Sequence, residues 1–248
     1  MTSFLYRAPS GVAGDVTRPD DTVVEPGLLN AAQAPTAFGA PVKLVSGKFE
    51  KIAASDAAAV FAGILSRIAP SIAGDTAQTF AGGTPNTDSV QGIVVEGYVN
   101  VVCTIGTPVR GDTVYMRVVA ASGKAVGDLE AISDIATTGA AGAGNVGNGT
   151  IGALSATQSA QVGVYVATMT GATAFQVVAP DGNQLKAGAT GAAYTAGGVT
   201  FTITVGATAM AAGDKFTVTV TKNNVALTGV TWAIDGRDSS NIAEILIK

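Results

Sequence analysis

One stretch decides the fold class: VQGIVVEGYVNVVC, which runs from Val90 to Cys103. Half of its residues are Val or Ile, and β-branched side chains favour strands because they pack well on a pleated surface. Gly97 interrupts the run, and a glycine in the middle of a strand suits a β-bulge. The stretch therefore predicts a long, bent strand at the centre of a β-sheet.

Further short strands are predicted on both sides of this stretch. The segment Asp112–Val119 alternates, with Val114, Met116 and Val118 on one face. Such a period of two is typical of a strand with one buried face. Residues Pro70–Asp88 are rich in Gly, Thr and Ser and are predicted to be a loop. The remaining strands expected in this part of the chain are Val42–Val45, Phe49–Ile52, Phe61–Leu65 and Ile242–Lys248.

A second group of strands follows from about residue 150. Thr200–Val205 and Phe216–Thr221 alternate strictly between apolar residues and Thr, which indicates strands buried on one side. The turn Pro180–Asn183 separates two others, because Pro fixes φ and Gly accepts a positive φ. Several short strands within about 70 residues predict a small immunoglobulin-like sandwich.

Composition excludes several classes of function. The 248 residues contain no His and one Cys, so a Ser-His-Asp triad, a His metal site and an internal disulfide are all excluded. The net charge of −4 argues against nucleic-acid binding through a basic face. Charged residues make up 13% of the chain, against about 25% in ordinary proteins. A surface with so little charge suggests that partners cover much of it, or that a Thr-rich β surface faces the outside of a particle.

The first 40 residues are predicted to form an extended arm. The first 41 residues contain five prolines and four glycines. Prolines at this spacing prevent a helix and discourage central strands. A short strand is predicted at Thr22–Glu25. An arm of this kind has little core of its own, so we expect it to lie on a neighbouring molecule; the alternative is a disordered tail.

The boundaries follow from these changes of pattern. Residues 137–152 are low in complexity and rich in Gly and Ala, which predicts a flexible linker. The arm is assigned to residues 1–40, a discontinuous β domain to 41–134 plus 223–248, and the linker with the inserted sandwich to 135–222. The predicted fold class is all-β: a β-barrel or tulip-like domain that carries an inserted immunoglobulin-like β-sandwich.

Two short motifs match known patterns. Gly142–Gly147 reads G-x-G-x-x-G, but such a site needs a preceding strand and a following helix whose N-terminus meets the phosphates. Neither is predicted here, so we interpret the motif as linker. Arg110-Gly111-Asp112 spells an adhesion tripeptide, and turn chemistry at the start of a strand explains it. No signal peptide or membrane helix is predicted, since no apolar stretch is long enough.

The remaining candidate residues have ordinary interpretations. Asp235, Asp238 and Asn241 could offer oxygens to Ca²⁺, but a solvated polar turn is favoured. Glu96 and Asp112 lie near strand ends, and nothing marks them as the paired carboxylates of a glycosidase. We therefore predict no catalytic, cofactor or metal residues, and no enzyme. Cys103 and Trp232 are predicted to be core residues, with Trp232 as an interface anchor in the alternative interpretation.

Three segments resemble the capsid cement, or decoration, proteins of tailed phages. Gly14–Arg18 followed by Val24–Pro26 is similar to their N-terminal segment, and Gly106–Val118 to their central segment. Thr231–Asp238 with Ile242–Ile245 is similar to their C-terminal ending. The inserted stretch is similar to a small β module that is appended to phage head proteins.

The resemblance implies a protein on the outer surface of the assembled head, made in the host cytoplasm. Its partners would be the major capsid protein and further copies of itself, as a homodimer or homotrimer. It would need no cofactor, nucleic acid or membrane. Two other classes stay open: another virion subunit, such as a head fibre or tail protein with a glycan-binding β module, and an enzyme or carbohydrate-binding domain.

Overall fold

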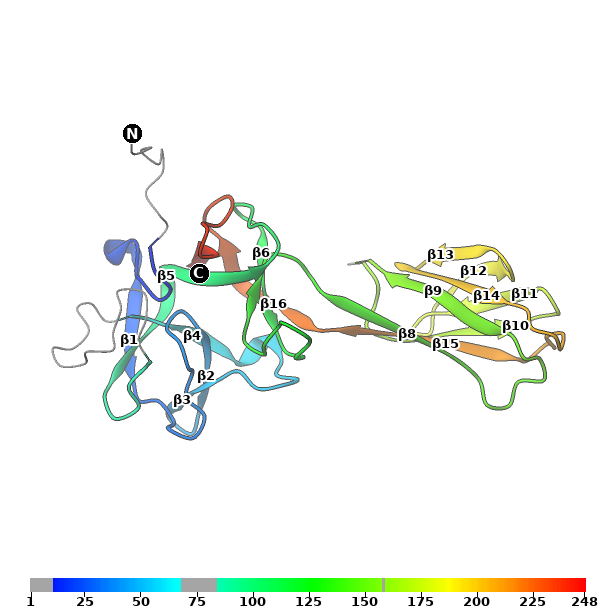
Figure 1. Ribbon diagram of the computed structural model, residues 1–248, viewed down its shortest axis with the longest axis horizontal. Helices are drawn as coiled ribbons and strands as arrows, with labels where there is room; N and C mark the ends of the chain where they lie inside the picture. The colour runs from blue at the N-terminus through cyan, green and yellow to red at the C-terminus, as the bar shows by residue number, and fades with distance from the viewer. Residues whose placement is uncertain (1–10, 68–83, 158) are drawn as a thin grey trace. The chain divides into compact units, whose positions relative to one another are not determined.

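The computed structural model describes residues 11–67, 84–157 and 159–248, and the chain forms two compact units (Figure 1). Unit 1 comprises residues up to Ser133 and from Asn224 onwards, and unit 2 comprises Asp134–Asn223. The described residues form strands and two short 3-10 helices, with no α-helix. The all-β prediction is therefore confirmed.

Unit 1 is built around a closed five-stranded barrel. Pairing runs in the order β17-β16-β6-β7-β5, and β17 pairs back with β5 to close the ring. Most neighbours are antiparallel, but β5 and β7 are parallel. The barrel strands are β5 (Gln91–Ile105), β6 (Thr113–Arg117), β7 (Leu129–Glu130), β16 (Asn224–Trp232) and β17 (Ile242–Ile247).

The long strand β5 also joins the barrel to a smaller group of strands. Gly97 has a φ of +104°, and an added Cβ there would lie 2.3 Å from the carbonyl oxygen of Asp21. The register of β5 against β1 shifts between Val94 and Glu96, so the irregularity predicted at Gly97 lies just before that residue. The added elements are η1 (Pro19–Asp21), β1 (Val23–Gly27), β2 (Pro41–Val45), β3 (Lys48–Lys51), η2 (Ala58–Val60) and β4 (Phe61–Leu65).

Two apolar cores hold unit 1 together. The barrel core contains Trp232, which is 1% exposed, together with Cys103, Met116 and Leu129. Both Trp232 and Cys103 were predicted to lie in the core, and both are buried there. The smaller core joins Leu29 to Val42, Phe49, Leu65 and Ile93.

The N-terminal segment differs from the predicted arm. Its first ten residues lie outside the described part of the chain, as do residues 68–83 of the predicted loop. From Gly14 onwards it follows the chain's own barrel: the Gly14 amide donates to the Asn100 carbonyl at 2.7 Å, and Val16 bridges to Val99. The strand predicted at Thr22–Glu25 is β1, and Leu29 is 2% exposed. The prediction of an arm without a core of its own is wrong for residues 14–40, because backbone pairing and Leu29 attach them to unit 1.

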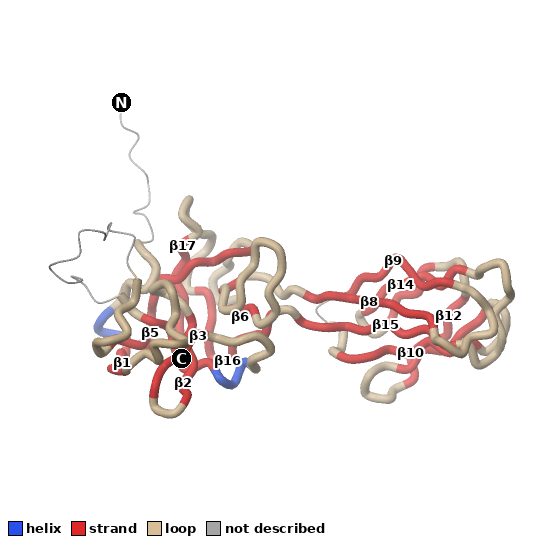
Figure 2. The backbone as a smooth tube through the Cα atoms, turned by 60° about the horizontal axis from the view of Figure 1, so that its bottom comes forward, coloured by secondary structure: helices blue, strands red, loops and turns tan. Residues whose placement is uncertain are grey.

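Unit 2 has two sheets around one apolar core (Figure 2). One sheet has the order β12-β11-β10-β15-β8, and the other β13-β14-β9. The alternation predicted for the two Thr-rich strands is present, since Phe201, Ile203, Phe216 and Val218 point into the core. The strands are β8 (Ile135–Ala141), β9 (Thr150–Ala156), β10 (Gly163–Met169), β11 (Ala174–Val178), β12 (Gln184–Ala189), β13 (Ala193–Ala196), β14 (Val199–Thr204) and β15 (Lys215–Lys222).

The predicted flexible linker is another difference. Residues 135–141 form β8, which pairs with β15 along its whole length. Gly139 makes room there, because an added Cβ would lie 2.9 Å from side-chain carbons of both Ile151 and Leu154, which would have to shift. The small residues that indicated a linker are therefore the ones that let β8 pack against β9.

The two ends of unit 2 lie side by side, which allows a test by excision. The Asn223 amide donates to the Asp134 carbonyl at 2.9 Å, and Thr221 pairs with Ala136. Replacing residues 137–220 with the hairpin turn Asn-Gly connects Ala136 to Thr221, which are already paired. We expect unit 1 to keep its cooperative unfolding transition within about 1 kcal/mol, because its two cores contain no residue of unit 2 and a short closing loop costs little entropy. Fluorescence of the single Trp232 reports this transition, and solvent-exposed emission in the native buffer would contradict the expectation.

Candidate functional site

Strand β1 forms an open edge of unit 1. It pairs with β5, and none of the other described strands pairs with it. Its side chains are exposed from Val23 to Pro26. An unpaired strand edge offers backbone N–H and C=O groups to an added strand, and Pro26 removes one donor from that row.

Apolar side chains gather along this edge. Val23, Val24 and Leu28 are 49%, 43% and 45% exposed, and Val90 is 55% exposed. Val90 lies beside β1 because the residue after it pairs with the last residue of the strand. These four residues and Pro26 are called the β1 edge surface below. Val24, Pro26 and Val90 line one hollow together, and exposed apolar side chains that gather in this way mark interaction sites more often than scattered ones do.

A hollow of about 340 Å³ adjoins the β1 edge surface. Its floor is open because Gly92 has no side chain: an added Cβ would lie 2.5 Å from the Ser66 hydroxyl oxygen. That hydroxyl donates to the Gly92 carbonyl at 2.8 Å. The walls are mostly apolar and comprise Val16, Val24, Pro26, Ser66, Arg67, Val90, Gln91 and Gly92. The hollow can accept an apolar side chain from a strand added to β1.

Four exposed acidic residues lie around β1, where Arg18 and Arg67 are the nearby basic residues. Asp20 and Asp21 in η1, Glu25 in β1 and Glu96 opposite Val23 are all exposed. Glu96 therefore belongs to the rim of this edge, whereas Asp112 lies in the turn before β6 and its backbone carbonyl accepts from the Trp232 amide at 2.9 Å. The acidic rim favours a partner strand that is neutral or basic.

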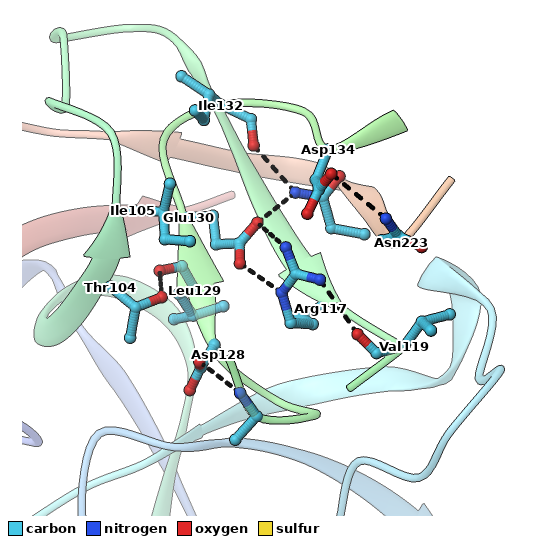
Figure 3. Close-up of polar contacts among 12 residues, drawn as sticks. Thr104, Ile105, Arg117, Val119, Asp128, Leu129, Glu130, Ile132, Asp134 and Asn223 are labelled. Carbon is cyan, nitrogen blue, oxygen red and sulfur yellow. Dashed lines mark hydrogen bonds and ion pairs between the residues drawn. The ribbon is translucent and has the colours of Figure 1, made fainter. Parts of the chain in front are cut away.

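A buried polar network lies in unit 1 (Figure 3). The Arg117 Nε donates to Glu130 Oε1 at 2.6 Å and its Nη2 to Glu130 Oε2 at 3.1 Å, a bidentate pair with both side chains fully buried. Arg117 Nη1 also donates to the Val119 carbonyl at 3.1 Å, and Asn224 Nδ2 donates to Glu130 and to the Ile132 carbonyl. The network ties β6 to β7 and to the start of β16.

The glycine motif of residues 142–147 holds a carboxylate of the protein itself. The backbone amides of Val146 and Gly147 donate to Asp214 at 2.7 and 2.9 Å, and that of Ala211 donates at 3.0 Å. These donors lower the pKa of Asp214 below its usual range. The amides of Val146 and Gly147 are therefore already occupied within the protein, and the motif forms an ordered loop rather than the flexible linker that was predicted.

This loop gives a testable pH dependence. Because the folded-state pKa of Asp214 is lowered, its stabilising effect is present above the unfolded carboxyl pKa of about 3.9 and is lost as the pH falls through the folded value. We expect Asp214→Asn to speed hydrogen exchange at the Val146 and Gly147 amides several-fold at neutral pH. In the parent protein, the same protection should fall below about pH 4. Unchanged protection in the variant would show that the carboxylate does not hold the loop.

The other sequence candidates are turn residues. Asp235 accepts from the Arg110 amide at 2.8 Å, so it holds the turn of the Arg-Gly-Asp tripeptide. Asp238 accepts from the Ser240 and Ile242 amides at 2.8 Å. Within the described ranges no group of three or more acidic or Cys side chains could hold a metal ion. Burial raises the pKa of the Cys103 thiol, so it stays protonated.

Sequence reasoning missed both the β1 edge surface and the Arg117 network. The prolines around β1 indicated an arm. The adjacent Val23 and Val24, shortly before Pro26, were the sequence feature that could have indicated an apolar edge strand. Arg117 follows Met116 in the predicted strand Asp112–Val119, so alternation puts it on the opposite face, where a charged residue is normally solvated. Nothing in the local pattern indicated its partner, because Glu130 lies in a two-residue strand.

The structure thus defines an all-β chain with an open strand edge, two β units and internally satisfied polar loops. None of its described helices is long and apolar enough to span a membrane. Residues 1–147 match the family model of the XM1 gp53 minor capsid protein, and the chain belongs to this family. It is accordingly a structural protein of the phage virion that associates with capsid components.

None of the curated proteins matches the chain. Among solved structures, two crystal forms of Xanthomonas campestris FlgL match, each with 24% identity and a TM-score of 0.29. They cover 37% and 36% of this chain, and the chain spans 30% and 29% of the FlgL chains.

Proposed function

We propose that the protein is a capsid cement protein, which binds the outer surface of the assembled phage head and bridges neighbouring major capsid protein subunits. The observation that carries the proposal is the family match over residues 1–147, most of which is unit 1 with its open β1 edge. The role requires neither catalysis nor a cofactor. It also explains why exposed apolar side chains occur beside an unpaired strand.

The β1 edge surface is the proposed contact with the shell. An extended segment of the major capsid protein would pair with β1 and place an apolar side chain in the hollow beside Val24 and Val90. Backbone pairing and apolar burial would supply the affinity, since exposed ion pairs contribute little. Many copies on one particle, acting as dimers or trimers, would raise the avidity through effective concentration.

The test uses purified particles that lack the protein. We expect addition of the full chain to raise the temperature at which DNA is released, because expansion of the shell must then break the added contacts. About 0.5 M salt should not release the bound protein, because salt screens exposed charges rather than apolar contacts. Equal release temperatures with and without bound protein, or release at moderate salt, would reject the cement role. Binding to a glycan array instead would favour a host-binding head fibre.

A substitution on the β1 edge tests the contact itself. We expect Val24→Asp to weaken binding to particles about tenfold or more, since a charge would enter the apolar contact beside the hollow, and each factor of ten is about 1.4 kcal/mol. Val109→Asp is the matched control, because Val109 is 50% exposed in unit 1 but lies outside this surface. Co-sedimentation with particles measures both. Equal weakening by the two variants would show that the β1 edge is not the contact.

A further inference from the structure

The outer face of the larger sheet in unit 2 is broad and uncharged. In β10, Val164 and Val166 point away from the core, and in β15 Thr217 and Thr219 lie directly opposite them. The same face continues through Val178 in β11 and Thr138 in β8. Figure 2 shows β8, β15 and β10 running side by side. These six residues define what we call the outer sheet face.

Unit 2 has no net charge. None of the six residues that define the outer sheet face is charged, and Lys215 and Lys222 lie at the two ends of β15. Asp214 is buried, and Lys186 lies over the Tyr194 ring at 5.8 Å. Unit 2 has three acidic and three basic residues and is neutral, so the net charge of −4 belongs to unit 1. The charged residues of unit 2 are Asp134, Asp181, Lys186, Asp214, Lys215 and Lys222.

We propose that the outer sheet face packs against the same face of a second copy of this chain. A neutral surface approaches its own copy without the repulsion that the acidic unit 1 would produce, and a net charge near zero favours association. Threonine hydroxyls both donate and accept, so a face rich in Thr is complementary to itself. The exposed valines Val164 and Val178, 44% and 36% exposed, would be buried in the contact.

The small area of the face implies that the contact forms on the particle rather than between free chains. Four strands about 4.8 Å apart and about five residues long span roughly 320 Å², so two copies would bury about 640 Å². This is about two fifths of a standard interface of roughly 1,600 Å², so the pair is weak for free chains. It becomes populated when neighbouring copies are held on one particle at high effective concentration. That the contact forms on the particle rests on the proposed capsid attachment, whereas the pairing of the two faces does not depend on it.

Cysteine cross-linking tests the pairing on particles. Val166 lies at the centre of the face, and the natural Cys103 is buried, so Val166→Cys adds the single accessible thiol of the described residues. Under mild oxidation of loaded particles we expect most of this variant to form disulfide-linked dimers. Thr202→Cys is the matched control, because Thr202 lies on the outer side of β14 in the other sheet, and it should stay monomeric. Fully bound Val166→Cys protein that stays monomeric, or that links only to the major capsid protein, would overturn the proposal.

A solution experiment separates this proposal from the cement role. Sedimentation of the full chain between about 10 µM and 1 mM should show weak self-association, as an interface of this size implies. Val166→Lys should abolish it by placing like charges in the contact, and Thr202→Lys should not. Self-association without particle binding would reject the cement role but would support the face-to-face contact. If the parent shows neither self-association nor cross-links, or if both lysine variants behave alike, the face-to-face contact is wrong.

Discussion

Glu130→Ala is expected to destabilise unit 1 by about 3–5 kcal/mol, because it removes one partner of a buried ion pair and leaves the other charge without compensation. Arg117 is fully buried, and Glu130 accepts two of its hydrogen bonds. The loss is a large part of the 5–15 kcal/mol that stabilises a typical domain. Urea unfolding followed by Trp232 fluorescence measures it, since the only Trp of the chain lies in the core of unit 1.

A double substitution is the control for this prediction. Arg117→Met with Glu130→Leu removes both charges and keeps apolar volume, and such replacements of buried pairs are often neutral or stabilising. Asn224 keeps its hydrogen bond to the Ile132 carbonyl in that variant. We therefore expect the double variant to recover most of the stability. A loss below about 1 kcal/mol for Glu130→Ala alone would show that the network contributes no more than a surface pair.

Local patterns predicted the strands but not how they close. The β-branched run around Val94 and the alternation of β14 and β15 depend on neighbouring residues, so they can be read from a short window. Closure of the barrel depends on the pairing of Val101 with Ala243, which are far apart in the chain. It also depends on β7, where Leu129 and Glu130 form a strand too short to show any period. Long-range pairing of this kind leaves no local signal.

The errors have a common physical cause, because composition was interpreted without the neighbouring surface. Gly139 indicated a linker by itself, yet it is the residue that lets β8 approach Ile151 and Leu154. The prolines around β1 indicated a free arm, yet an edge strand tolerates proline because one side of it is unpaired. The candidate interface was missed for the same reason, since its exposed valines become informative only once β1 is known to pair on one side.

Leu29→Ala is expected to destabilise unit 1 by about 2–5 kcal/mol, the usual range for a leucine removed from a packed core. Leu29 is 2% exposed and packs with Phe49 and Ile93 in the smaller core. This result would show that the N-terminal segment contributes to the stability of the isolated protein. An unchanged urea midpoint for Trp232 fluorescence would instead restore the picture of an arm that is ordered only by a neighbour.

The adjacent residue provides the control, because Leu28 is 45% exposed where Leu29 is buried. Leu28→Ala should change the unfolding free energy by no more than about 0.5 kcal/mol, as surface substitutions generally do. If the β1 edge surface contacts the shell, however, Leu28→Ala should weaken binding to particles. Removal of residues 11–30 should destabilise unit 1 more than Leu29→Ala, since it also removes the pairing of β1 with β5. The two leucines thus separate what this segment does for the fold from what it does for attachment, and a pair of variants with equal effects on stability would contradict the burial that distinguishes them.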